Sequence, residues 1–200
     1  MGGNMLTKLK GVFLLLVVLT ATSSCGRSTQ SSDPVEVIEF RQVLAIAASP
    51  SSEFEVLGEK FKDISCANLP PNSGKSIDLI ACDNTSTSIY FLGPSELDGN
   101  SIESAKPFKS FDTFVVQINF DDFGRKAFAN FTARVTRLAA PQNQIAISQG
   151  TVVITAPSIN EEITGGQAQI TGSFSFEEAL QLASSIQDKQ PLPGSYLKNK

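Results

Sequence analysis

The sequence predicts an α+β domain with a mainly antiparallel sheet and helices packed on one face of it. Three observations support this class. Apolar segments occur in pairs around polar turns, other segments alternate apolar and polar residues, and helix-start signals follow directly after strands. With 200 residues, 41% hydrophobic and 18% charged, the chain has the composition of one ordinary globular domain.

The first predicted elements are a strand and a helix. Residues 35–46, VEVIEFRQVLAI, have the β-branched density of a strand. Residues 52–64, SEFEVLGEKFKDI, carry apolar side chains at helical spacing, which predicts a helix. The positions concerned are Phe54, Leu57, Phe61 and Ile64.

A hairpin and a separate strand follow. The prolines and glycine of CANLPPNSGKS predict a loop, and two short strands, SIDLIAC at 76–82 and SIYFLG at 88–93, flank the polar turn DNTST. In TFVVQINF, residues 113–120, apolar and polar side chains alternate as in a half-buried strand. Phe114, Val116, Ile118 and Phe120 are expected on one face.

The next helix begins at the cap Asp121. Its expected buried stripe is Phe123, Ala127, Phe128, Phe131 and Val135. Beyond it, residues 143–156, NQIAISQGTVVITA, predict two strands about the Gln149–Gly150 turn.

The last predicted elements are a strand at QAQIT, residues 167–171, and a helix that starts with the capping box of Ser175 and Glu178. The side chains expected to be buried by this helix are Phe176, Ala179, Leu180, Ala183 and Ile186.

The N-terminus has the pattern of an export signal. Lysines precede the uncharged run GVFLLLVVLTA, which is shorter than the roughly 20 residues that cross a bilayer. Small residues directly before Cys25 resemble the lipobox of bacterial lipoproteins, although Thr22 stands where leucine is usual. We therefore expect a signal peptide at 1–24, lipidation of Cys25 and a polar tether at 25–34. Ordinary secretion with an incidental cysteine is the alternative.

The two remaining cysteines form an even pair. With Cys25 lipidated, Cys66 and Cys82 lie in a compartment that permits disulfides, and we expect them to be bonded. Two buried free thiols are the alternative. A metal site is not expected, because two cysteines without any histidine leave a soft metal short of its usual four ligands.

Composition also argues against several functions. The formal net charge of -4 becomes -6 when Lys8 and Lys10 leave with the signal peptide, so a nucleic-acid partner is not expected. Without histidine there is no Ser-His-Asp or Cys-His arrangement, and no phosphate loop is present. The acidic pairs Asp121-Asp122 and Glu177-Glu178 fit helix starts. We expect neither an enzyme nor a cofactor.

A family resemblance covers most of the chain. The stretch TVVITAPSINEEITGGQAQITGSFSFEEALQLASSI, residues 151–186, resembles a segment of the SecD subunit of bacterial protein translocase, in the head of its first periplasmic region (P1). YFLGPSELDGNSIESA and VVQINFDDFGRKAFANFT are similar to upstream parts of the same head. The resemblance spans about 35–195, which we expect to be one SecD P1 head-like domain, with residues 196–200 as a tail.

The resemblance implies a location and a function. SecD continues into membrane helices that work with SecF, and we expect no counterpart of those helices in this chain. We therefore expect a non-enzymatic lipoprotein on the extracytoplasmic face of the cell membrane, contacting unfolded secreted polypeptides or translocase subunits in protein export. The alternative is an envelope adapter lipoprotein that reuses the fold and binds another envelope protein.

The segment between Pro157 and Gly166, here called the GG loop, can be interpreted in two ways. In one, Gly165 and Gly166 adopt positive φ and Asn160 hydrogen-bonds within the turn, so that the motif is a signature of the fold. In the other, the loop binds polypeptides as the SecD head is thought to do, with Ile159 and Ile163 exposed for apolar contact. The candidate polypeptide-binding residues are Ser158, Ile159, Asn160, Ile163, Thr164, Gly165 and Gly166.

Overall fold

The computed structural model describes residues 37–70, 74 and 78–191, all within the compact unit Asp33–Lys200. The signal peptide, Cys25, the tether and the tail lie outside the described residues. The strands are β1 (Glu39–Ala48), β2 (Ser51–Val56), β3 (Glu59–Ile64), β4 (Leu79–Asp83), β5 (Ser88–Asp98), β6 (Ile102–Ser110), β7 (Thr113–Phe120), β8 (Ile145–Gln149), β9 (Val152–Thr155) and β10 (Gln167–Phe174); the helices are α1 (Asp122–Val135), α2 (Phe176–Gln187) and a short 3₁₀ turn, Gly99–Ser101.

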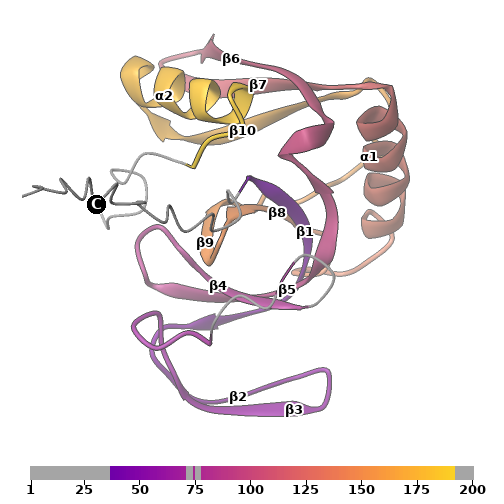
Figure 1. Ribbon diagram of the computed structural model, residues 1–200. Helices are drawn as coiled ribbons and strands as arrows, with labels where there is room; N and C mark the ends of the chain where they lie inside the picture. Colours follow the sequence, from indigo (N-terminus) through magenta and orange to yellow (C-terminus); the bar gives the residue numbers. More distant parts are fainter. Residues whose placement is uncertain (1–36, 71–73, 75–77, 192–200) are drawn as a thin grey trace, which may run out of the picture. The chain divides into compact units, whose positions relative to one another are not determined.

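Five strands close into a small barrel in the order β1-β5-β4-β9-β8 (Figure 1). Every pairing is antiparallel except that of β4 with β9. Because side chains alternate along a strand, one set fills the barrel and the other faces outward. The interior set is Val43, Leu79, Ala81, Leu92, Ala146 and Val153.

Arg41 is fully buried and lies opposite Ala146 on β8, so its side chain belongs to the interior set. Its Nε donates to Glu39 Oε2 over 2.7 Å. Its guanidinium also donates to the carbonyls of Gly93, at 2.8 Å, and Gly74, at 3.1 Å. The buried charge is therefore paired and hydrogen-bonded, as a charge away from water has to be.

A second, three-stranded sheet has the order β10-β7-β6. Its apolar face, the two helices and the outer surface of the barrel share one core. Val116, Ile118 and Phe120 of β7 enter this core, as their alternation predicts. The α+β class with mainly antiparallel strands is confirmed, and the strands divide into three sheets.

Both helix starts follow the predicted signals. Asp121 accepts a hydrogen bond from Gly124 N over 2.7 Å, and Ser175 and Glu178 form the full capping box. In α1 the buried side is Gly124, Phe128, Phe131, Thr132 and Val135. A Cβ on Gly124 would come within 2.7 Å of Ser101 O, so this position admits only glycine against the 3₁₀ turn.

Three side chains predicted to be buried are exposed. Phe123 is 73% exposed, Phe176 51% and Leu180 38%. Phe123 and Leu180 each lie one residue, about 100°, away from the buried side of their helix. In α2 the buried residues are Ala179, Leu182, Ala183 and Ile186.

The predicted helix at 52–64 is wrong: these residues form the β2–β3 hairpin, which turns at Leu57 and Gly58 with φ of 52° and 81°. Phe54 pairs with Phe61 on the side that faces the barrel. On the other side Glu53 lies opposite Lys62 and Glu55 opposite Lys60. Opposite charges across the strands thus stabilise the hairpin. Strand β6, which the sequence reading missed, pairs with β7.

Candidate functional site

The GG loop joins β9 to β10 and is fixed at both ends by backbone hydrogen bonds. Ile159 N donates to Asn143 O over 2.9 Å, next to a bridge between Gln144 and Ser158. At the other end, Phe120 N donates to Gly166 O over 2.9 Å. The loop is therefore held between the residues directly before β8 and the end of β7.

A threonine of α1 holds the middle of the loop. Thr132 is fully buried, and its hydroxyl donates to Phe128 O over 2.9 Å. The same oxygen accepts a hydrogen bond from Ile163 N over 3.0 Å. Because the hydroxyl satisfies a loop N–H as well as an α1 carbonyl, the loop and the helix are held together by one side chain.

The structure explains why glycine is required at the second position of the pair, Gly166. It has φ of 71°, and a Cβ there would lie 2.8 Å from Cγ and Cδ of Arg125. Both the backbone conformation and the close contact with α1 therefore require glycine. Gly165 does not adopt positive φ, contrary to the prediction, and has open space around its Cα.

The exposure of the loop differs from the prediction at one isoleucine. Ile159 is only 7% exposed and belongs to the core, so the expectation that it offers apolar surface is wrong. Ile163 is half-buried and packs against the same core. Ser158, Asn160, Thr164 and Gly165 are exposed. The predicted hydrogen bond of Asn160 within the turn is absent from the described residues.

An apolar cavity of about 230 Å³ lies beside the loop. The loop contributes Pro157, Ser158, Ile159 and Ile163 to its lining. The opposite side is formed by Phe40 of β1, Phe128 of α1, Ile145 and Ile147 of β8, and Ala168 and Gln169 of β10. Of the predicted loop residues, Ser158, Ile159 and Ile163 line this hollow, whereas Asn160, Thr164, Gly165 and Gly166 do not.

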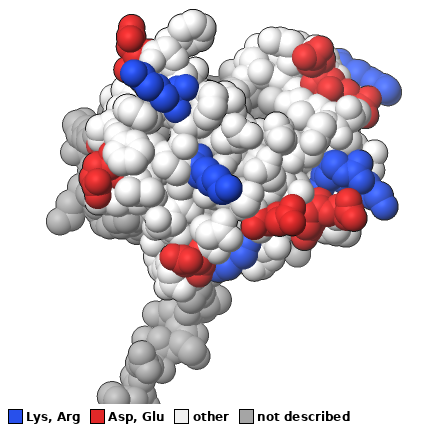
Figure 2. Space-filling model, turned by 90° about the horizontal axis from the view of Figure 1, so that it is seen from above, with Lys and Arg blue, Asp and Glu red and all other residues white. Residues whose placement is uncertain are grey.

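The structure also places several phenylalanines on the surface at the β6–β7 turn. Phe111 is 94% exposed at the turn, and Phe108 on β6 is 49% exposed. Phe176 begins α2 beside the turn and packs against Phe114 with ring centroids 5.4 Å apart. Figure 2 looks onto the end of the domain where β6, β7 and α2 lie; uncharged surface is interspersed there with acidic and basic side chains, and a basic side chain lies near the middle. We call Phe111 and Phe176 the phenylalanine patch; Phe108, which lies opposite Val115 and not Phe114, is on the other face of the sheet.

The expected disulfide of Cys66 and Cys82 is present, with the two Cα atoms 5.8 Å apart. It joins the segment after β3 to β4. Next to it, burial raises the pKa of Asp83, but hydrogen bonds from Thr85, Ser88 N and Thr87 outweigh burial. The pKa of Asp83 is therefore lowered from its usual 3.8.

The barrel, the sheet and the anchored loop define an α+β domain with apolar hollows at its surface. The sequence model of the family described as SecDF, P1 head subdomain, matches residues 78–189. The chain therefore belongs to the SecDF P1 head family. In the part of the chain that the structure describes, no helix has the length and apolarity needed to cross a membrane.

Relatives of the chain are protein translocase subunits. It is 36% identical to the SecD subunit of Streptomyces coelicolor over 48% of this chain and 18% of the relative. It is 33% identical to that of Calditerrivibrio nitroreducens over 80% of this chain and 32% of the relative. The chain thus spans a third or less of the length of these relatives. A solved structure described as SecDF, a membrane component that enhances protein export, is 25% identical over 80% of this chain and 64% of that chain, with a TM-score of 0.48.

Proposed function

We propose that the chain is a non-enzymatic, lipid-anchored domain that contacts polypeptides during or after their export across the membrane. The observation that carries this proposal is the family match over residues 78–189, which includes the whole GG loop. The relatives bearing the same head are named protein translocase subunits. No cofactor has a role in this function, since binding and release of a chain need only surface contacts.

The loop and its cavity supply the contacts in this proposal. An apolar side chain of an extended polypeptide would enter the cavity beside Ile163 and Phe128, while Ser158 and Thr164 contact its backbone at the rim. A small interface that orders a flexible chain loses much of its contact energy to entropy. Affinity of roughly micromolar or weaker is therefore expected.

The anchor in this proposal is Cys25. A lipid there would hold the domain on the extracytoplasmic face of the cell membrane, through the polar tether of residues 25–34. Bacterial lipoproteins carry more than one acyl chain on the cysteine, and a single chain would bind a bilayer only marginally. Proximity to the membrane would raise the chance of meeting polypeptides as they emerge.

The test places a photo-crosslinker on a cysteine introduced at Ser158 or Thr164 of the full chain, in cells that export a labelled substrate. Both positions are exposed at the rim of the loop. Ser184→Cys on the exposed side of α2 is the matched control. We expect crosslinks to the exported chain from the loop positions and few from the control. No crosslinks from either loop position would contradict the proposed role of the loop.

A second function, an envelope adapter that binds a folded envelope protein, is favoured by the phenylalanine patch. Exposed aromatic side chains close to one another are typical of protein–protein contacts. Phe111 and Phe176 are more than half exposed. Exposure of apolar surface to water is unfavourable, so covering these rings with a partner would contribute to binding. Pull-down with Phe111→Ser/Phe176→Ser against the unchanged chain tests this. A partner that is lost only from the variant would assign the patch to adapter binding.

A further inference from the structure

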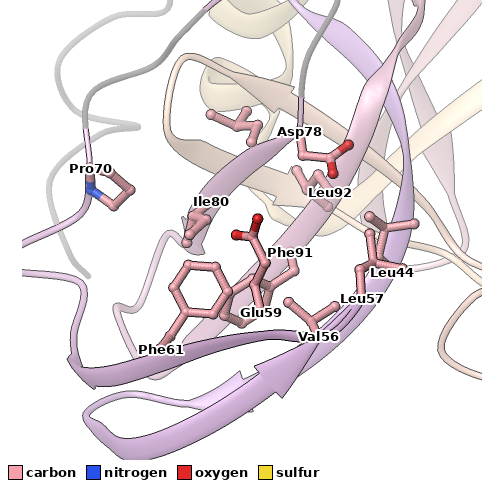
Figure 3. Close-up of a pocket in the computed structure, with 11 residues that line it drawn as sticks. Leu44, Val56, Leu57, Glu59, Phe61, Pro70, Asp78, Ile80, Phe91 and Leu92 are labelled. Atoms are coloured by element: carbon pink, nitrogen blue, oxygen red, sulfur yellow. The ribbon is translucent and has the colours of Figure 1, made fainter.

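A larger cavity, of about 420 Å³, lies between the β2–β3 hairpin and the barrel (Figure 3). The hairpin side is lined by Val56, Leu57 and Phe61, and the barrel side by Leu44, Ile80 and Phe91. Its volume falls within the range of roughly 300–1,000 Å³ in which proteins bind small groups. The hairpin side precedes the family match, which begins at residue 78. This cavity is therefore separate from the GG loop.

The hairpin is held firmly against the barrel at the inner end of the cavity. Phe91 of β5 stacks on Phe54 with ring centroids 4.7 Å apart and contacts Phe61 at 5.1 Å. The Cys66–Cys82 disulfide ties the segment after β3 to β4. At the other end, Leu57 at the turn is 70% exposed. The cavity thus has fixed walls and opens near the tip of the hairpin.

The charges around the cavity are not balanced. On the outer side of the hairpin, Glu53 and Glu55 lie opposite lysines, and Glu55 is 3.8 Å from Lys60 Nζ. Glu59, paired with Val56, lies on the inner side, and Figure 3 shows its carboxylate directed toward Ile80. Asp78 adds a second carboxylate, and among the described residues that line the cavity none is cationic. The carboxylates of Glu59 and Asp78 have no ion-pair or hydrogen-bond partner among the described residues.

We infer that this cavity binds a cationic and apolar segment of an extended polypeptide, an inference that rests on the proposed function. A bulky apolar side chain occupies the space between Phe61 and Ile80, and a neighbouring lysine or arginine pairs with Glu59 and Asp78. Apolar lining accounts for the first contact and the two unpaired carboxylates for the second. Acidic segments are rejected, because they would place like charges together.

The experiment measures fluorescence anisotropy of short labelled peptides titrated with the full chain. One peptide has leucine beside arginines in a glycine-serine background. A second replaces the arginines by glutamates, and a third replaces the leucine by serine. We expect the first to bind about tenfold more tightly than either of the others, and added salt to weaken only the charged contribution. Equal affinity for the arginine and glutamate peptides overturns the inference.

Variants then assign the binding to this cavity. Glu59→Gln/Asp78→Asn removes both charges with little change in shape, and we expect about tenfold weaker binding of the arginine peptide. Glu103→Gln/Asp112→Asn removes the same charge from exposed positions that lie outside both the cavity lining and the hairpin; it is the matched control and is expected to bind as the wild type does. Wild-type binding by the first variant, or equal weakening by both, overturns the assignment.

Failure of this inference can be separated from failure of the proposed function. Crosslinks from Ser158 and Thr164 together with charge-independent peptide binding would retain the proposed function and overturn only the cavity's role. The absence of crosslinks from both loop positions, together with no binding of any peptide, would overturn both the proposed function and the inference about the cavity. Sedimentation that shows a dimer dissociated by Glu59→Gln/Asp78→Asn would assign the cavity to a second copy of the chain, which also overturns the inference.

Discussion

At the scale of single residues, Gly166 and Gly165 differ although they are neighbours in one motif. Gly166 combines φ of 71° with the close approach of Arg125, whereas Gly165 has neither constraint. The double glycine therefore has one position that the fold requires and one that it does not. Only Gly166 supports the reading of the motif as a fold signature.

Gly166→Ala is expected to lower the free energy of unfolding by at least about 1–2 kcal/mol, the cost of a left-handed conformation for a residue with a Cβ. Contact with Arg125 adds to it. Gly165→Ala should change stability by less than about 0.5 kcal/mol. Urea unfolding measures both, and Arg125→Ala in the Gly166→Ala background should recover the part due to contact. Equal losses for the two glycines would contradict this account.

Asp83 predicts a dependence of stability on pH. Four hydrogen bonds to its carboxylate, from Thr85, Ser88 N and both the N–H and the hydroxyl of Thr87, lower its pKa in the folded state. A lowered folded pKa contributes stability above the unfolded pKa, and this contribution is lost as pH falls through the folded value. Between neutral and strongly acidic pH, the free energy of unfolding should therefore decrease.

The measurement compares urea unfolding of the wild type and Asp83→Asn across that pH range. The variant should be less stable at neutral pH and should approach the wild type in acid. Asp112→Asn, at an exposed carboxylate in the β6–β7 turn, should keep the wild-type slope. A constant difference between Asp83→Asn and wild type at every pH would show that the carboxylate's charge is not involved.

Sequence predicted the role of a residue most accurately where that role depends on its near neighbours in the chain. The caps at Asp121 and Ser175 depend on side chains a few residues away and are confirmed. The exposure of Phe123 and Ile159 depends on distant strands and helices. Phe123 was predicted to be buried but is exposed, and Ile159, expected to be exposed if the loop binds polypeptides, is buried. A loop isoleucine can be a core residue when other elements enclose it, and no local pattern reports that.

At the scale of elements, the β2–β3 hairpin shows where the sequence reading failed. Apolar residues at 54, 57, 61 and 64 fit a helix, but Leu57 lies in the turn with φ of 52° and is exposed. Alternation of Glu53, Phe54 and Glu55 before Gly58, mirrored by Lys60, Phe61 and Lys62 after it, was the signal for a hairpin. Closure of the barrel joins strands far apart in the chain and could not be predicted from periodicity.

The disulfide gives a prediction for this element. Cys66→Ala/Cys82→Ala should lower the free energy of unfolding by about 3 kcal/mol, the chain-entropy value for a loop of about this length. Hydrogen exchange should accelerate in β2 and β3, which the bond holds to β4. The three-stranded sheet should keep its protection because its core is separate from that of the hairpin.

Intact-mass analysis before and after reduction tests the bond itself, with a gain of two hydrogens expected. Thiol labelling of the unreduced, denatured chain should modify neither Cys66 nor Cys82. Labelling of both would contradict the bond. Faster exchange spread evenly over all strands of the variant would contradict its local role at the hairpin.

At the scale of the whole molecule, the family is predictable from sequence because its motifs lie in one order along the chain. The match over 78–189 confirms that resemblance. Residues 37–70 build the hairpin and much of the larger cavity, and they precede the match. The cavity could not be foreseen, since its walls come from strands that meet only after folding.

The proposed lipid anchor on Cys25 gives the prediction at this scale. The wild-type chain should fractionate with membranes, and Cys25→Ser should leave nearly all of it in the soluble or secreted fraction, because in this proposal the lipid on Cys25 is what holds the domain to the bilayer. Metabolic labelling with an alkyne fatty acid, followed by fractionation, measures this. Cys66→Ala/Cys82→Ala should remain labelled. An unlabelled wild-type chain in the medium would contradict the anchor.

Arg41 inside the barrel has a consequence for how a polypeptide could travel past this domain. The guanidinium and its partners Glu39, Gly93 and Gly74 occupy the interior beside the packed apolar side chains. The barrel interior is therefore filled and is not a channel. A polypeptide passing through it would have to displace the hydrogen-bond partners of the buried Arg41 guanidinium, at a high cost in free energy. If the proposed function holds, an exported chain contacts the outer surface of the domain and does not pass through the barrel.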